Sequence, residues 1–167
     1  SLNKGFEIGN GGIVQLALDA RSQNDDNKAS ANGYTYEQAY GLAGKSTYGG
    51  YGTPKTNLLT LGYNAELPID DSLSLYSFTT YSRRKAEQGQ NFRLPTITNT
   101  ITIGPNGYPA GYTPTWYIDE DDFQAAFGGK GTVGEWDWDL STTYGRNEAE
   151  QGTTHNQNPS LGEAPPN

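Results

Sequence analysis

Apolar and polar residues alternate one by one over several stretches of the chain, which is the pattern of β-strands that have one wet face. A helix, which repeats every 3.6 residues, would not separate them in this way. The pattern predicts an all-β chain, an antiparallel meander of about five strands, near 6–24, 57–68, 73–94, 121–134 and 136–150. The clearest alternation is in the last strand, where one row contains Trp136, Trp138, Leu140, Thr142 and Tyr144.

Short and long connections alternate between these strands. Turn-forming residues at 68–72, and the pair Gly134-Glu135, predict two tight hairpins. Long polar stretches, rich in Gly, Tyr, Asn and Pro, lie at about 25–56 and 95–120. Short periplasmic turns and long extracellular loops are the layout of an outer-membrane barrel. We therefore expect the strands to form part of a transmembrane β-barrel wall, with the short turns in the periplasm.

The composition fits such a wall, although it leaves a rival open. Only 33% of the residues are hydrophobic, yet the chain has 12 Tyr, 5 Phe, 3 Trp and 22 Gly. A barrel wall is a single layer between lipid and water, so about half of each strand can be polar. A soluble β-sandwich also tolerates few aliphatic residues, but it must bury one face of each sheet.

The net charge and the absence of certain residue types exclude several classes of function and site. A formal net charge of −8 argues against binding to nucleic acid or to anionic lipid surfaces, which attract basic patches. The absence of cysteine excludes disulfides, thiolate metal sites and cysteine nucleophiles. No apolar run reaches the roughly 18 residues of a membrane helix. The start, without Met or an apolar signal segment, suggests a processed product, an excised segment or part of a longer chain.

Two parts of the chain resemble barrel strands of TonB-dependent receptors. The first is Asn57–Tyr63 followed by Ser74–Arg84, and the second is Gly134–Asn147. Further similarity lies around Tyr108-Pro109, at Asp121-Asp122-Phe123 and at 158–162. The resemblance extends from about Gly5 to Gly162.

The resemblance implies a 22-stranded barrel that is closed by an N-terminal plug domain. Such receptors import scarce nutrients such as iron-siderophores, cobalamin or glycans, with energy from an inner-membrane complex. About five strands cannot close a barrel, and the chain has no plug domain, no energy-coupling box and no aromatic final residue. We therefore expect residues 1–167 to be a mid-barrel segment in the outer membrane of a Gram-negative bacterium. Its partners would be the rest of the barrel and plug, outer-membrane lipid and, through the missing regions, the energy-coupling complex.

Aromatic residues supply the candidate binding sites. The row of Trp136, Trp138, Leu140 and Tyr144 is expected to face lipid, with Trp and Tyr at its two ends as interfacial girdles require. Aromatic residues of the two long loops could stack on sugars or aromatic chelators, or could pack within the loops. They are Tyr34, Tyr36, Tyr40, Tyr48, Tyr51, Tyr108, Tyr112, Trp116 and Tyr117.

Charged residues offer little for catalysis. The run Asp119–Asp122 could hold Ca²⁺, but it lacks the spacing of a calcium loop and is interpreted as a solvated loop rim. These carboxylates, or Glu148 with Glu150, could form a glycosidase pair only at a suitable separation. His155 is the single histidine and is expected in a surface loop. The run 83–85 is a rim charge cluster or a site for an anionic ligand. We therefore expect no enzyme activity, no cofactor and no metal site.

Because such a sheet has unpaired edges, the sequence also allows a second class of protein. A five-stranded sheet outside a barrel exposes two edges, and exposed edges recruit further strands. The alternative is a self-assembling extracellular module, such as an adhesin or fibre subunit, whose partners are copies of itself.

Overall fold

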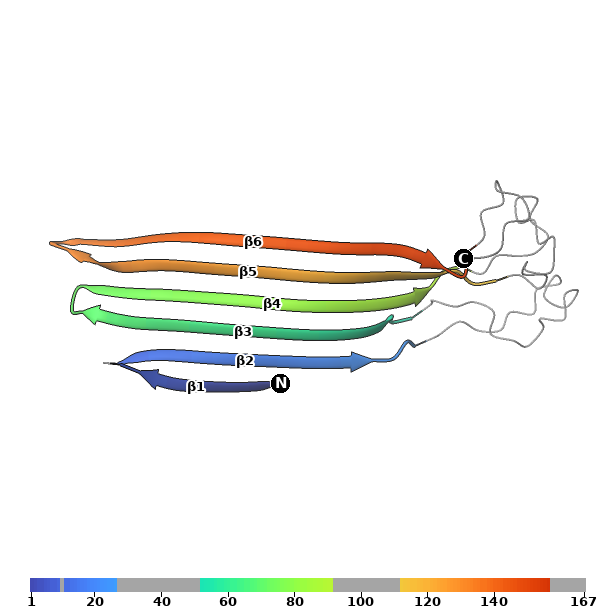
Figure 1. The fold of residues 1–167 in the computed structure, drawn as a ribbon, viewed down its shortest axis with the longest axis horizontal. Coiled ribbons are helices and arrows are strands. Elements are labelled where there is room, and N and C mark those ends of the chain that lie inside the picture. The colour runs from blue at the N-terminus through green and yellow to red at the C-terminus, as the bar shows by residue number, and fades with distance from the viewer. Residues whose placement is uncertain (10, 27–51, 92–111, 157–167) are drawn as a thin grey trace, which may run out of the picture. The chain divides into compact units, whose positions relative to one another are not determined.

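The computed structural model describes residues 1–9, 11–26, 52–91 and 112–156. These residues form one unclosed, antiparallel six-stranded sheet with the strands in sequence order (Figure 1). The strands are β1 (Leu2–Ile8), β2 (Gly12–Gln23), β3 (Lys55–Asp70), β4 (Leu73–Gly89), β5 (Thr115–Val133) and β6 (Trp136–Thr154). The all-β antiparallel meander is therefore confirmed.

The expected number of about five strands is wrong, because the stretch 6–24 is not one strand. It is part of a hairpin in which Leu2 pairs with Leu18 and Ile8 with Gly12. Gly9 and Gly11 have φ values of 54° and 83°, which glycine adopts without the penalty that a Cβ imposes. The chain therefore turns back at residues 9–11, and β1 and β2 take the place of the single expected strand.

Several strand boundaries also differ from the expectation, among them the start of β3 at Lys55 and the end of β6 at Thr154. β3 continues through Pro68 to Asp70, where the Asp70 carboxylate accepts hydrogen bonds from the Ser72 N–H and Oγ at 2.7 and 2.8 Å. β4 ends at Gly89 instead of 94. β5 begins at Thr115, so residues 115–120 belong to a strand and not to the long loop. The hairpins β3–β4 and β5–β6 form as predicted, the second with Gly134 at φ 64°.

The chain divides into two compact units. The first unit contains residues 1–21, 57–84 and 119–149, and the second contains residues 22–56, 85–118 and 150–167. The first unit includes all of β1 and the β3–β4 and β5–β6 turns. It holds the two sheet faces described next.

Contacts between strands of the first unit assign its side chains to two faces. A Cβ at Gly12 would touch Leu67, and a Cβ at Gly129 would lie near both Leu75 and Trp138. Because side chains alternate along each strand, these contacts place the even positions of β1, β2 and β6 with the odd positions of β3, β4 and β5. We call this the apolar face. The opposite, polar face includes Glu66, Tyr76, Lys130, Asp139 and Ser141, which are linked by contacts of their own.

Neither face is sealed by a large core within the described part of the chain. The buried hydrophobic residues are Ala86, Tyr112 and Ala126. None of them is a large aliphatic residue of the kind that fills a sandwich core. In the described ranges, no helix is long and apolar enough to cross a membrane.

Candidate functional site

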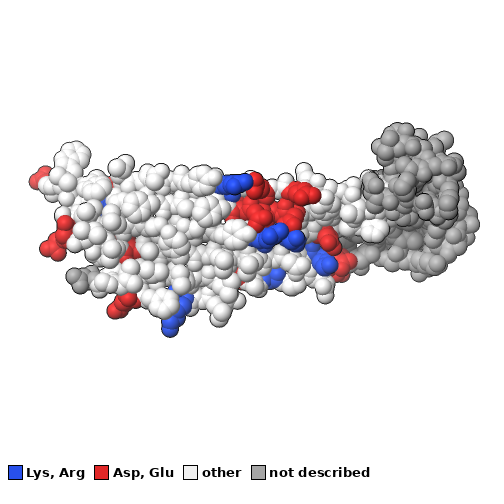
Figure 2. All heavy atoms as spheres, viewed as in Figure 1, with Lys and Arg blue, Asp and Glu red and all other residues white. Residues whose placement is uncertain are grey.

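Exposed hydrophobic side chains are concentrated on the apolar face. Of the 16 large hydrophobic residues that are exposed in the described part of the chain, all but Ile13 and Phe78 belong to it. Trp136, Leu140 and Leu2 have exposed fractions of 80%, 75% and 70%. The others are Phe6, Ile8, Leu16, Leu59, Leu61, Tyr63, Ile69, Phe127, Val133, Trp138 and Tyr144. Figure 2 shows acidic side chains at the turn ends of the strands and a larger group of charged side chains farther along the sheet, with a mostly uncharged surface between them.

The uncharged part of the apolar face has a similar length on four neighbouring strands. It covers 13 residues on β3, 11 residues on β5, and 9 residues on β4 and β6. Charged residues begin directly beyond it, with Arg83 on β4, Asp121 on β5 and Arg146 on β6. We call this uncharged stretch the apolar band. Its segments are Asn57–Ile69, Leu73–Tyr81, Phe123–Val133 and Trp136–Tyr144.

Aromatic residues mark both ends of the apolar band. At the turn end, Trp136 and Trp138 follow the β5–β6 turn, and Trp138 lies over Gly129 and Gly131. At the far end, the rings of Phe123 and Tyr144 lie with their centroids 6.2 Å apart. Tyr81 ends the band on β4, whereas Tyr63 lies near the middle of the band on β3; both line one groove. We call the far row, which consists of Tyr81, Phe123 and Tyr144, the aromatic row.

The acidic run Asp119–Asp122 lies in β5 and not in a loop rim, so that interpretation is wrong. Its members alternate between the faces because the run is a strand. On the apolar face, Asp119 pairs with Arg83 at 3.3 Å, and Asp121 accepts a hydrogen bond from the Tyr81 hydroxyl at 2.5 Å. The run is therefore two cross-strand pairings on this face instead of one cluster.

On the polar face, the other two carboxylates of the run share the Asn147 side chain. Its amide donates to Glu120 at 3.0 Å and to Asp122 at 3.1 Å, and Arg84 pairs with Glu120 at 2.6 Å. The hydrogen bonds from Asn147 and Arg84 lower the pKa of Glu120, because they stabilise its charged form. Among the described residues, no group of three or more His, Asp or Glu side chains is arranged to hold a metal ion.

The basic run Arg83-Arg84-Lys85 also lies within a strand. Arg83 and Arg84 point to opposite faces, and each is paired with a carboxylate of β5. The run therefore does not form one cluster, because its two arginines lie on opposite faces and each already forms an ion pair. His155 directly follows β6, with its Nδ1 at 3.4 Å from the Thr154 hydroxyl.

The four residues expected to face lipid lie together on one face of β6, and all four are exposed. Trp136, Trp138, Leu140 and Tyr144 have exposed fractions of 80%, 38%, 75% and 59%. All four belong to the apolar face. The structure thus brings together the row that the sequence pattern selected.

The loop aromatics are placed only in part. Tyr112 is buried, and Trp116 and Tyr117 belong to β5 instead of a loop. The Tyr117 hydroxyl donates to Glu150 at 3.3 Å, and its ring lies against Gly152. The other candidates, Tyr34, Tyr36, Tyr40, Tyr48, Tyr51 and Tyr108, lie outside the described residues. Their role in ligand binding stays a prediction.

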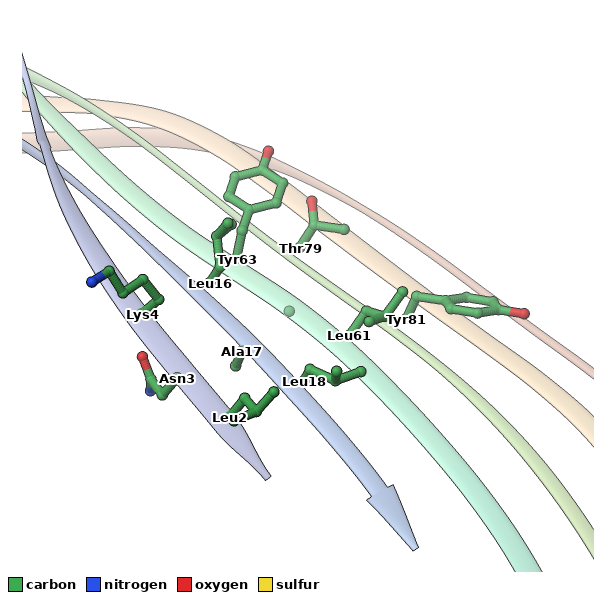
Figure 3. Close-up of a pocket in the computed structure, with 11 residues that line it drawn as sticks. Leu2, Asn3, Lys4, Leu16, Ala17, Leu18, Leu61, Tyr63, Thr79 and Tyr81 are labelled. Atoms are coloured by element: carbon green, nitrogen blue, oxygen red, sulfur yellow. The ribbon is translucent and has the colours of Figure 1, made fainter.

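Sequence reasoning missed a groove on the apolar face. It has a volume of about 580 Å³ and runs across β1 to β4, where Leu2, Leu16, Leu18, Leu61, Tyr63 and Tyr81 line it (Figure 3). The groove depends on the β1–β2 hairpin. Only recognition of the turn at Gly9 and Gly11 could have pointed to it.

No protein-family model, no curated protein and no solved structure matches this chain. The functional conclusion below therefore depends on the two faces of the sheet and on the resemblance of its strands.

Proposed function

We propose that this sheet is a stretch of wall in an outer-membrane β-barrel, with the apolar face toward lipid and the polar face toward the lumen. The observation that carries the proposal is the one-sided exposure, since 14 of the 16 exposed large hydrophobic residues in the described ranges share one face. Moving one such side chain into apolar surroundings contributes roughly 1.5–3 kcal/mol. A contiguous exposed surface of this kind marks an interface with a partner or a membrane.

The dimensions of the apolar band favour a membrane over a second sheet. A transmembrane β-strand needs about 9–11 residues, and the band has 9 residues on β4 and β6, 11 on β5 and 13 on β3. Tryptophans at the turn end and the aromatic row at the far end resemble the two aromatic girdles of such barrels. If this face were packed in a sandwich core, nothing would explain why its charged residues begin at the same level along neighbouring strands.

The parent protein, on this proposal, is a TonB-dependent importer of a scarce nutrient such as a siderophore, cobalamin or a glycan. The resemblance of 57–63, 74–84 and 134–147 to strands of that family supports this class. This sheet would supply part of the wall, and the segments between β2 and β3 and between β4 and β5 would supply two extracellular loops. The proposal includes no catalytic step.

Neighbouring threonines of β6 allow a matched test of the wall. Thr142 belongs to the apolar face and Thr143 to the polar face, and both are exposed. The 167 residues contain no cysteine, so a spin label on Thr142→Cys or Thr143→Cys is unique within them. In the full-length protein in lipid vesicles, the label at 142 should be relaxed more strongly by oxygen, and the label at 143 by a water-soluble nickel complex. Equal accessibility at both positions would contradict the wall.

Import is tested separately by shortening the two long connections. Deletions restricted to 27–51 or 92–111 leave every described strand intact. Uptake by the host under iron, cobalamin or glycan limitation should fall in one or both deletions. A deletion of similar size in another long connection of the barrel serves as the control. Full uptake with both segments removed would remove them from ligand recognition.

A second function stays open because of the β6 edge. No described strand pairs with the outer edge of β6, and all but one of its 19 residues are exposed. Unpaired edges recruit further strands, so an adhesin or fibre subunit would join copies through this edge. The isolated chain would then form oligomers or filaments in detergent-free buffer. A monodisperse monomer there would contradict both this alternative and the barrel wall.

A further inference from the structure

Charged residues of the polar face lie in two separate zones on the strands of the first unit. The zone toward the turns consists of Glu7, Glu66, Asp70, Lys130, Asp137 and Asp139. The zone farther along the strands consists of Asp19, Arg21, Arg84, Glu120 and Asp122. Between these zones the polar face is uncharged on all six strands. We call this uncharged stretch the neutral belt.

The neutral belt presents amide and hydroxyl groups without partners of their own. Each strand contributes at least one exposed side chain of this kind, namely Asn3, Gln15, Asn64, Thr80, Gln124 and Thr143. In the described part of the chain, none of these six side chains makes a hydrogen bond. Amides and hydroxyls both donate and accept, so the belt offers uncharged hydrogen-bonding groups of both kinds to a ligand.

Phe78 of β4 adds an aromatic ring to the neutral belt. It is 37% exposed, although it belongs to the polar face. A Cβ at Gly62 would lie 4.0 Å from the Thr80 methyl group, so these two residues are neighbours on β3 and β4. In an antiparallel pair, the same register places Asn64 beside Phe78. The ring is therefore flanked by an exposed amide and, along its own strand, by an exposed hydroxyl.

We propose that the neutral belt is a binding site for an uncharged carbohydrate. The Phe78 ring lies against the apolar face of a sugar ring, and the surrounding amides and hydroxyls bond to the sugar hydroxyls. Ligand sites of this kind combine an apolar contact with a few polar groups that fix orientation. The inference depends on the proposed function, because the polar face must line the lumen. It selects a glycan from the three nutrient classes.

Charged solutes fit the neutral belt less well than uncharged ones. Every basic residue on the polar face of the described strands is already paired with a carboxylate. The pairs are Arg21 with Asp19 at 2.6 Å, Arg84 with Glu120 at 2.6 Å and Lys130 with Glu66 at 2.9 Å. An anionic solute therefore meets no free cation on this face, and a cationic one is drawn to the acidic residues of the two zones and not to the belt.

Direct binding to the full-length protein in detergent tests the site. The probes are the neutral oligosaccharides maltohexaose, cellohexaose, xylohexaose and mannohexaose, and the acidic hexagalacturonate, each titrated by isothermal calorimetry. At least one neutral oligosaccharide should bind, and hexagalacturonate should not. The inference is overturned if no neutral oligosaccharide binds, or if hexagalacturonate binds more tightly than all of them.

Two phenylalanines on opposite faces allow a matched assignment of the contact. Phe78→Ala and Phe78→Leu should each weaken binding of the neutral oligosaccharide about tenfold, because the aromatic contact is lost, whereas Phe78→Tyr should retain it. Asn64→Ala should weaken binding several-fold. Phe127→Ala, an exposed residue of the apolar face on β5, is the control and should leave binding unchanged. Undiminished binding by both Phe78→Ala and Phe78→Leu would overturn the site.

The outcomes separate this site from the proposed function. If the spin labels at 142 and 143 support the wall but no oligosaccharide binds, the carbohydrate site alone is overturned. Binding of cyanocobalamin that depends on Phe78, with no oligosaccharide bound, would likewise replace the carbohydrate and leave an importer. Binding lost in Phe127→Ala but not in Phe78→Ala would instead contradict the wall, because the apolar face would then meet the solute.

Discussion

Tyr76 of β4 lies directly against Gly128 of β5 on the polar face. A Cβ at position 128 would lie 2.5 Å from Tyr76 Cζ and 2.9 Å from the Ser141 Cβ. The Tyr76 hydroxyl donates to Asp139 at 2.6 Å, and the Lys130 ammonium lies 6.0 Å from the ring centre. The ring is therefore held on both sides over a position that only glycine can occupy without displacing it.

Gly128→Ala should destabilise the sheet by about 1–3 kcal/mol, the typical cost of overpacking, because the ring must move and lose the Asp139 hydrogen bond. Urea unfolding monitored by tryptophan fluorescence measures this change. Gly145→Ala is the matched control, since the nearest atom to its added Cβ is the Phe123 carbonyl oxygen at 3.9 Å. Equal midpoints for the two variants would contradict the role of the Tyr76 contact.

Gly131→Ala should be more destabilising than Gly128→Ala. A Cβ at position 131 would lie 2.0 Å from the backbone oxygen of Ser72, which also accepts the Thr132 N–H at 3.0 Å. Backbone cannot rotate away as a tyrosine ring can, so β4 and β5 would have to separate at this point. The same unfolding experiment ranks the variants, and a smaller loss for Gly131→Ala would show that the strands are not this close.

The sequence pattern predicted β3 to β6 but merged β1 with β2, for a geometric reason. The connection at residues 9–11 has three residues, so even positions lie on the apolar face both before and after it. The alternation therefore continues through the turn without a change of phase. At Gly134-Glu135 the connection has two residues, and the apolar row changes from odd Val133 to even Trp136. That change of phase made the second turn easy to recognise.

The sequence predicted which residues of the site share a face within one strand, but not which residues of different strands lie side by side. The alternation of β6 was enough to select Trp136, Trp138, Leu140 and Tyr144. The aromatic row joins residues of three strands, and its alignment depends on strand register, which no single strand encodes. Likewise, Asp119–Asp122 resembled a loop because the cross-strand partners of its members, from Tyr81 to Asn147, lie 25 to 40 residues away.

Acid should weaken the polar network around Glu120. Its pKa is lowered by hydrogen bonds from Asn147 and Arg84, so its charged form stabilises the folded state. This contribution is complete above the ordinary glutamate pKa of about 4.3 and is lost as the pH falls through the lower folded-state value. Glu120→Gln should therefore reduce stability at neutral pH and flatten its decline in acid. Urea midpoints between neutral pH and pH 3 measure this, with Glu135→Gln in the exposed β5–β6 turn as the control.

The orientation of the proposed wall is testable at the two ends of the hairpins. Glu135 lies in the short β5–β6 turn, and Gln90 directly follows β4 on the side of a long connection; both side chains are exposed. Short turns of such barrels face the periplasm, so a maleimide reagent too large for porins should label Gln90→Cys on intact cells. It should label Glu135→Cys only after the outer membrane is permeabilised. The reverse result would invert the orientation, and labelling of both positions on intact cells would contradict a spanning sheet, because no strand could then separate the two compartments.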